Sequence, residues 1–274
     1  MAVAAPSLLA GSSGGLPEQD KSLIINEYLS SRYWYQRNTL WQYDDYDIRM
    51  TDTAWFGVTP EPIAVEIANE MEAKHARRGH KPSVIIDLFA GAGGNTIQFA
   101  LSGHWDRVIA VERDAATLAC AQHNAEVYEV AEYITFVHAD CFDFLNRLAN
   151  RPGALDDALN VRLGLGLGLG GGSAALARDV EVFASPPWGG VGYQQADVFD
   201  LEAALEPYSL THISAACRPM AHALFLPRNG DLRQLASLVP DGAAEKLDVV
   251  QYCVKGATKG LVAYYPPEGE HKAP

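Results

Sequence analysis

From residue 81 onward, short apolar runs alternate with segments that have the apolar spacing of amphipathic helices. We expect strands at 82–90, 107–114, 133–140, 180–184, 222–227, 247–256 and 260–266. We expect helices at 95–103, 116–129, 200–215 and 231–238. Only a short polar break separates the last two strands, which predicts an antiparallel hairpin at one sheet edge. The expected fold class is therefore α/β, a doubly wound, mostly parallel seven-stranded sheet with one antiparallel edge strand.

The chain before residue 81 has a different pattern. Residues 1–20 read as a flexible tail, and residues 21–80 are rich in aromatic side chains with helical spacing at 23–37 and 59–78. Thr59 is the expected N-cap of the second helix, with Pro60 at its first position. We therefore expect a helical N-terminal extension, then a domain at 81–266 and a tail at 267–274. Gly-Leu repeats predict a flexible insertion at about 152–178.

Composition narrows the class of protein. The 274 residues, 48% of them hydrophobic, suffice for one α/β domain with extensions, and no apolar run reaches membrane-spanning length. The N-terminus lacks the basic residues of a secretory signal. Four cysteines lie far apart without CxxC spacing, and the histidines show no metal spacing. We therefore expect an intracellular protein with reduced thiols in or near the core, no disulfide and no metal.

Charge limits the kind of partner. A formal net charge of −13 argues against sequence-independent binding along a nucleic-acid backbone, because such binding needs a broad basic surface. It remains compatible with a protein that holds a single nucleotide in a pocket through a few local basic contacts.

A glycine-rich segment follows the first expected strand of the domain. In "DLFAGAGGNT", residues 87–96, Gly91, Gly93 and Gly94 allow a tight turn and close approach of a ligand to the backbone. The segment opens a helix, whose N-terminus favours polar or anionic groups. Ligands of doubly wound sheets bind at the carboxyl ends of the strands, where this turn lies. An ordinary structural turn would show the same glycines, so the loop alone is ambiguous.

Acidic residues end the first three strands of the domain. Asp87, Glu112 and Asp140 would all lie at the carboxyl edge of the sheet, around the glycine loop. Such a ring repels a pyrophosphate but suits a ligand with free hydroxyls, an amine and a positive charge. S-adenosylmethionine has all three, whereas NAD carries a pyrophosphate. Solvated strand ends are the alternative for any one of these carboxylates.

The fourth strand leads into "SPPW", residues 185–188. A small polar residue, two prolines and an aromatic form the arrangement used by nitrogen-directed methyltransferases. Two prolines fix the backbone, so the turn can aim a carbonyl and the Ser185 side chain at an exocyclic amine. The Trp188 ring would hold a planar base in line with the methyl group. The expected chemistry is catalysis by proximity and orientation, without a strong base.

Five segments, "WFGVTPEPIA", "DLFAGAGGNTIQFA", "HNAEVY", "SPPWGG" and "FLPRN", together resemble the trimethylguanosine synthase family, over about residues 26–265. The resemblance implies a class I (Rossmann-like) methyltransferase. It also implies two successive transfers from S-adenosylmethionine to the N2 amine of a 7-methylguanosine RNA cap. Small nuclear and small nucleolar RNAs are the implied substrates. The implied partners are ribonucleoprotein core proteins that recruit the enzyme. The implied location is the nucleus, and the cytoplasm is a second one.

The resemblance also implies roles for individual residues. It assigns cofactor binding to the acidic strand ends Asp87, Glu112 and Asp140 and to the loop glycines Gly91 and Gly93. Thr59 and Trp41 of the N-terminal extension would cover the cofactor pocket. For Trp41 a buried anchoring role is the alternative. It assigns catalysis and the capped base to the turn and to three further residues: Ser185, the Pro186 carbonyl, Trp188, Asn124, Arg32 and Arg228. The two arginines would lie near the cap phosphates.

Two alternatives stay open. An enzyme with the same chemistry could act on another RNA or DNA amine or on a protein glutamine. A degenerate site would leave a cap-binding protein without activity.

Overall fold

The computed structural model describes residues 37–42, 47–150, 173–239 and 247–267. The chain divides into two units, 1–36 and 37–274, and the description concerns the second. The expected tails, the helix at 23–37, Arg32 and most of the Gly-Leu insertion therefore lie outside the described residues. Within the described part, no helix is both long and apolar enough to cross a membrane.

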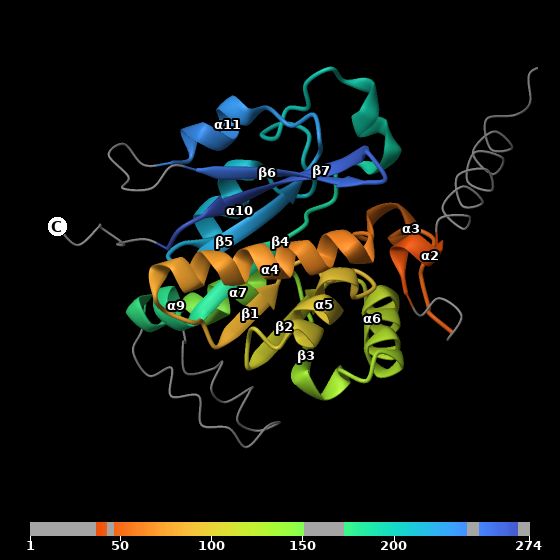
Figure 1. Cartoon of the computed structure of the whole chain (residues 1–274). Coiled ribbons are helices and arrows are strands. Elements are labelled where there is room, and N and C mark those ends of the chain that lie inside the picture. Colours follow the sequence, from red (N-terminus) through yellow and green to blue (C-terminus); the bar gives the residue numbers. More distant parts are fainter. Residues whose placement is uncertain (1–36, 43–46, 151–172, 240–246, 268–274) are drawn as a thin grey trace, which may run out of the picture. The chain divides into compact units, whose positions relative to one another are not determined.

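A seven-stranded sheet forms the centre of the domain (Figure 1). Its strands are β1 Val84–Asp87, β2 Arg107–Glu112, β3 Ile134–His138, β4 Val180–Ala184, β5 Ala221–Leu226, β6 Asp248–Val254 and β7 Ala257–Tyr265. They are ordered β3-β2-β1-β4-β5-β7-β6. All neighbours are parallel except β7, which is antiparallel to both β5 and β6. This topology confirms the predicted doubly wound fold, with the hairpin of β6 and β7 at one edge.

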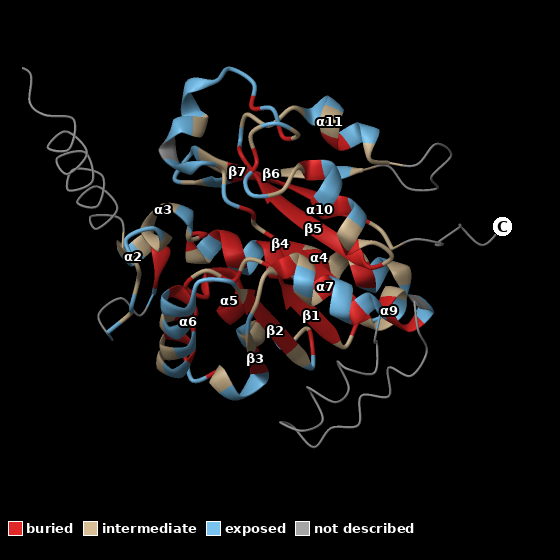
Figure 2. Cartoon of the chain, turned by 180° about the vertical axis from the view of Figure 1, so that it is seen from behind, coloured by how far each residue is buried: buried red, intermediate tan, exposed pale blue. Residues whose placement is uncertain are grey.

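Helices cover both faces of the sheet. One core cluster joins it to α4 Glu61–Arg78, α5 Gly94–Ser102 and α6 Ala115–Val127. The other joins it to α7 Cys141–Asn150, α9 Ser173–Asp179, α10 Leu210–Cys217 and α11 Leu232–Ser237. Successive strand side chains point to opposite faces, so Val84 and Ile86 enter the second cluster while Ile85 enters the first. Figure 2 shows the result, buried strands between helices with exposed outer surfaces.

Short helical turns complete the fold: α2 Arg37–Leu40, α3 Ala54–Gly57 and the 3-10 turns η2 Ala131–Tyr133 and η3 Gly190–Gln195. The first two belong to the expected N-terminal extension. α3 lies in the segment that leads into α4, and α4 runs across the sheet in Figure 1.

The start of α4 differs from the prediction. The helix begins at Glu61 with Pro60 as N-cap, so the expected capping role of Thr59 is wrong. Pro62 occupies the first turn instead, where a missing N–H costs nothing. Thr59 accepts a hydrogen bond from Asn95 Nδ2 at 2.8 Å, so its hydroxyl joins the extension to the first turn of α5.

Two further predicted segments are wrong in extent. Of the helix expected at 200–215, only α10 forms, and Ser209 is its N-cap. The segment before it is a turn, in which the Asp200 carboxylate accepts hydrogen bonds from the N–H groups of Glu202 and Ala203. Pro207 also prevents a continuous helix, because proline is not tolerated in a helix interior. Residues 173–178, which the sequence placed in the flexible insertion, belong instead to α9, where Leu176 is buried.

The cysteines divide between core and surface. Cys141 and Cys217 are buried and Cys120 is half-buried, as a core or near-core thiol should be. Cys253 is exposed, which corrects the prediction for this residue. It lies on β6, the edge strand of the sheet as far as the chain is described.

Candidate active site

Four neighbouring strands bring the predicted site residues to one edge of the sheet. β1 and β4 pair in parallel with Asp87 opposite Phe183, and Leu88 N donates to Phe183 O at 2.9 Å. The glycine loop and the 185–188 turn therefore leave adjacent strands at the same edge. On the other side of β1 lie β2, which ends at Glu112, and then β3, which Asp140 follows.

Two glycines of the loop have backbone conformations that favour glycine. Gly91 has φ +54° and Gly93 has φ +96°, conformations that other residues rarely adopt. A Cβ on Gly93 would also lie 3.2 Å from Ile97 Cδ1 and 3.4 Å from Ala121. The loop is further fixed because Gly91 N donates to Glu112 Oε2 at 3.0 Å. The backbone at the start of α5 is thus held close to the carboxylate that ends β2.

Asp87 is a buried carboxyl at the base of this loop, with 1% of its surface exposed. Thr96 Oγ1 donates to its Oδ2 at 2.7 Å and Phe89 N to its Oδ1 at 3.4 Å. Burial raises the pKa of Asp87 to about 7 despite these bonds, with a smaller contribution from the nearby Glu112 charge. A cationic ligand beside it would favour the ionised form.

Glu112 and Asp140 are half-buried and keep their carboxylates at the edge. Besides Gly91 N, Glu112 accepts from Asp114 N at 2.9 Å. Asp140 Oδ1 accepts from Phe142 N and its Oδ2 from the Tyr208 hydroxyl, each at 2.8 Å. A carboxylate offers about four acceptor sites, so both retain room for donors of a ligand. An acceptor set of this kind fits the hydroxyls and amines of an adenosine-type cofactor and opposes phosphate.

The proline turn carries a tryptophan into the same region. Ser185 and Trp188 are half-buried and Pro186 is buried. The Trp188 ring meets Phe225 edge-on at 5.4 Å and Tyr193 at 5.1 Å between centroids. These contacts fix the indole while part of it stays accessible, so the turn can present a flat aromatic surface to a base.

Asn124 does not take the predicted role in this structure. Its side chain is fully buried on α6 and its Oδ1 accepts from Arg49 N at 2.8 Å. Its Nδ2 donates to Arg49 O and to Ala92 O, both at 2.9 Å. A base cannot reach an amide enclosed and bonded in this way. Asn124 instead ties the extension at Arg49 to the glycine loop at Ala92, which is a positioning role.

The remaining predicted residues lie around this centre in different ways. Trp41 is 1% exposed and packs on Tyr128 at 6.1 Å, so it is the buried anchor that the sequence left as an alternative to a pocket cover. A side chain lining an open pocket would expose more of its surface. Thr59 is 2% exposed and bonded to Asn95, which places it behind the glycine loop. Arg228 is exposed, with Nη1 3.5 Å from Thr258 O.

Two residues that the sequence did not single out belong to this site. Tyr208 bonds Asp140, and Asn229 Nδ2 donates to the carbonyls of Tyr193 at 3.1 Å and Ala196 at 2.7 Å, in the loop after Trp188. Asn229 was part of the quoted "FLPRN" segment, but nothing in the pattern indicated its contacts. Tyr208 fell inside a segment predicted to be helical, which concealed it.

Comparison with known proteins identifies the family to which this sequence is similar. The sequence model of the RNA cap guanine-N2 methyltransferases matches residues 82–268. Trimethylguanosine synthase of Schizosaccharomyces pombe is 32% identical over 243 residues, covering 87% of this chain and 86% of the relative. Trimethylguanosine synthase of Saccharomyces cerevisiae is 32% identical over 238 residues, covering 84% of this chain and 65% of the relative.

Solved structures agree on the fold. A putative methyltransferase from Porphyromonas gingivalis is 14% identical with a TM-score of 0.57, over 93% of this chain and 52% of that one. The METTL16 methyltransferase domain is 14% identical with a TM-score of 0.50, over 91% and 82%. At such identity the likeness concerns the arrangement of strands and helices.

Proposed function

The chain belongs to the RNA cap guanine-N2 methyltransferase family, and from this premise we propose that it methylates the N2 amine of a 7-methylguanosine cap twice. S-adenosylmethionine is the methyl donor, and a capped RNA is the substrate class. The proposed product is the 2,2,7-trimethylguanosine cap of small nuclear and small nucleolar RNAs. Ribonucleoprotein core proteins would recruit the enzyme, and we propose the nucleus as its location and the cytoplasm as a second one.

The register of β1 and β4 is the observation that carries this proposal. It puts the glycine loop, with its acidic strand ends, directly beside the proline turn with Trp188. A methyl donor held by the first and an amine held by the second would therefore be neighbours. Proximity of this kind supplies most of the catalysis that a methyl transfer to an aromatic amine needs.

The turn performs two tasks in this proposal: it orients the amine and it stacks on the base. When bound, S-adenosylmethionine supplies an electrophilic methyl group on a positively charged sulfur. Ser185 and the Pro186 carbonyl accept hydrogen bonds from the N2 amine and orient its lone pair. Trp188 stacks on the base, and the positive charge of 7-methylguanine adds cation–π attraction worth roughly 1–2 kcal/mol. That attraction gives a physical reason for a 7-methyl requirement. The amine proton leaves to water after the transfer.

The test compares methyl transfer from labelled S-adenosylmethionine to 7-methyl-GTP and to GTP, by wild type and Trp188→Ala at equal cofactor saturation. We expect transfer to the methylated nucleotide alone, with mono- and dimethylated N2 products separated by chromatography. The Trp188→Ala variant should lose about fivefold to 150-fold in kcat/KM, since stacking on one base contributes roughly 1–3 kcal/mol.

Other results would redirect the assignment. Equal transfer to both nucleotides would contradict the cationic stack. No transfer to either, with intact cofactor binding, would point to another amine acceptor or to a cap-binding protein without activity.

A further inference from the structure

Tyr208 completes the hydrogen bonding of Asp140, the carboxylate that follows β3. Its hydroxyl donates to Asp140 Oδ2 at 2.8 Å. The other oxygen, Oδ1, accepts from Phe142 N at 2.8 Å and from Asp143 N at 3.4 Å, at the start of α7. Of about four acceptor sites on a carboxylate, three are therefore in use. One remains for a donor of a ligand.

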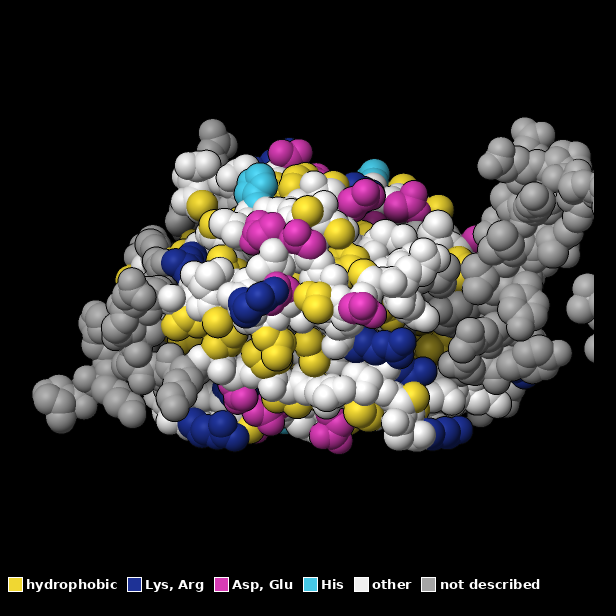
Figure 3. All heavy atoms as spheres, turned by 90° about the horizontal axis from the view of Figure 1, so that it is seen from above, with side chains coloured by type: hydrophobic (Ala, Val, Ile, Leu, Met, Phe, Trp, Pro, Cys, Tyr) yellow, Lys and Arg dark blue, Asp and Glu magenta, His cyan; other side chains and the backbone are white. Residues whose placement is uncertain are grey.

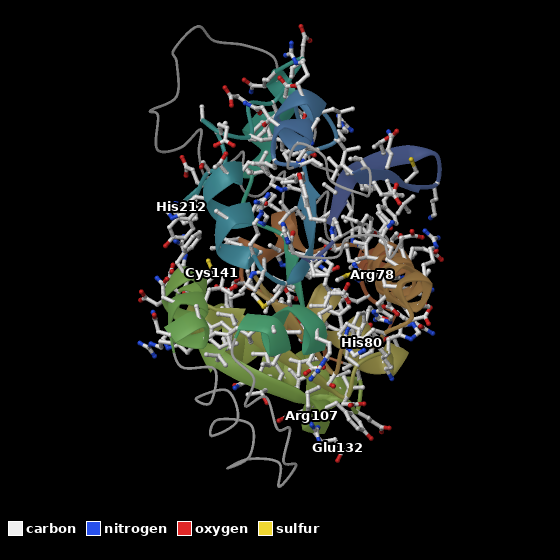
Figure 4. The ribbon with its side chains drawn as sticks, turned by 90° about the vertical axis from the view of Figure 1, so that its left-hand side faces the viewer. Arg78, His80, Arg107, Glu132, Cys141 and His212 are labelled. Carbon is white, nitrogen blue, oxygen red and sulfur yellow. The ribbon has the colours of Figure 1, made fainter. Side chains whose placement is uncertain are left out.

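The tyrosine ring is itself held between two helices. Its centroid lies 4.0 Å from that of Phe142 on α7 and 5.6 Å from that of His212 on α10, and Phe142 and His212 are 4.4 Å apart. In Figure 4, Cys141 and His212 mark these two neighbouring helices. Because Tyr208 immediately precedes the Ser209 cap of α10, its backbone is also fixed. The hydroxyl therefore meets Asp140 in one orientation.

The direction of this hydrogen bond is settled by charge. Asp140 is an acceptor when ionised, and the bond to it raises the pKa of Tyr208 to about 12. The phenol thus remains a donor across the physiological pH range. It fixes the rotation of the carboxylate and leaves the remaining lone pair in a set direction.

Tyr208 also lies close in sequence to a residue that contacts the proline turn, where the methyl-accepting base is proposed to bind. Two residues before it, Glu206 N donates to Pro187 O at 3.4 Å, within the proline turn. The segment 206–208 therefore joins the turn that carries Trp188 to the carboxylate at the end of β3. The contact between Tyr208 and Asp140 joins residues that are 68 positions apart, so the sequence alone does not indicate it.

We propose that Tyr208 is a positioning residue that orients Asp140 to accept a hydrogen bond from the exocyclic amine of the cofactor's adenine. This inference rests on the proposed function for the presence of S-adenosylmethionine. A fixed carboxylate, which can only accept, selects an amine over a carbonyl at that position of the purine. A carbonyl there would leave two acceptors facing each other without a proton, which is costly away from water.

The test measures binding by calorimetry, with no methyl transfer involved. Two probes are S-adenosylhomocysteine and S-inosylhomocysteine, in which a carbonyl replaces the adenine amine. Tyr208→Phe should raise the Kd for S-adenosylhomocysteine about threefold to tenfold, the loss of one orienting hydrogen bond. The Kd for the inosyl compound should change by less than about twofold. Tyr133→Phe, at a tyrosine 46% exposed, is the matched control.

A second variant separates orientation from folding. In an Asp140→Ala background, Tyr208→Phe should no longer affect S-adenosylhomocysteine binding, because the acceptor that it orients is gone. Equal losses for both probes, or an unchanged Kd for S-adenosylhomocysteine, would overturn the inference. A chain that shows the expected selectivity but transfers no methyl to 7-methyl-GTP would contradict the proposed function while leaving this inference standing.

Discussion

At the scale of single residues, Asp87 couples folding to pH. Its pKa is about 7 in the folded chain because burial penalises the charged carboxylate. An unfolded aspartate has a pKa near 3.9. The folded state therefore binds more protons between about pH 4 and pH 7, and the free energy of unfolding falls as the pH rises through this window, by up to about 4 kcal/mol from this group.

Asp87→Asn should remove that dependence while keeping an oxygen to accept from Thr96 Oγ1. Urea unfolding at pH 5 and pH 7 measures it, as the change in unfolding free energy between the two pH values for each protein. We expect the variant to lose less stability than wild type on going to pH 7. Asp106→Asn, at an exposed aspartate, is the control. Parallel behaviour of Asp87→Asn and wild type would contradict the assignment.

Asn229 is the residue on which the loop after Trp188 depends. Its side-chain Nδ2 donates to two carbonyls of that loop, and its backbone carbonyl accepts from Phe199 N at 2.7 Å. Asn229→Ala removes the two side-chain bonds, each worth about 1 kcal/mol, and should lower kcat/KM for 7-methyl-GTP roughly fivefold to thirtyfold. Cofactor affinity should stay unchanged. Gln195→Ala, an exposed side chain of the same loop, should match wild type; an equal effect there would refute the role of Asn229.

At the scale of elements, the apolar pattern located the five parallel strands because buried parallel strands leave a short run of apolar residues. It located β6 and β7 because two apolar runs lie on either side of a short polar break. Helix ends were harder to locate. The Thr59 hydroxyl could have capped α4 in isolation, but in the fold Asn95, 36 residues away, donates to it instead. Segment 200–209 has helical spacing, yet the Asp200 carboxylate and Pro207 favour a turn. Local signals therefore compete with contacts that the sequence does not show.

The same limit applies to the site. Parallel strands necessarily bring their carboxyl ends to one edge, so the grouping of Asp87, Glu112 and Asp140 could be predicted. The burial of Asn124 could not, because an asparagine that binds a base and one that binds backbone look alike in sequence. Its three bonds to Arg49 and Ala92 appear only when α6, the extension and the glycine loop are assembled.

The junction of the glycine loop with α5 and α6 gives a prediction at this scale. Gly93→Ala places a Cβ at φ +96° and 3.2 Å from Ile97 Cδ1, so both strain and crowding oppose it. Gly103→Ala, at φ +65° with open space around it, has only the strain of about 1–2 kcal/mol. Urea unfolding should show a larger loss for Gly93→Ala, accompanied by weaker S-adenosylhomocysteine binding. Equal losses of stability would show that α6 is not tightly packed against the loop.

At the scale of the whole molecule, charge limits how much of an RNA the protein can grip. The net charge is −13, and Figure 3 shows acidic, basic and apolar side chains interspersed over the face in view. Affinity for capped RNA should therefore reside in the cap, through the cationic base and its phosphates, with little added by the chain beyond it.

This predicts a shallow salt dependence that is insensitive to RNA length. We expect a 7-methylguanosine-capped dinucleotide and a capped RNA of about 20 nucleotides to bind within about threefold of each other. For both, a plot of log K against log salt should have a slope near −2, the value for two or three phosphate contacts on single-stranded RNA. Fluorescence anisotropy of labelled RNAs between 50 and 200 mM salt measures it, with uncapped RNA of equal length as control. A slope steeper than about −5 for the longer RNA alone would mean that a basic surface outside the cap site binds its backbone.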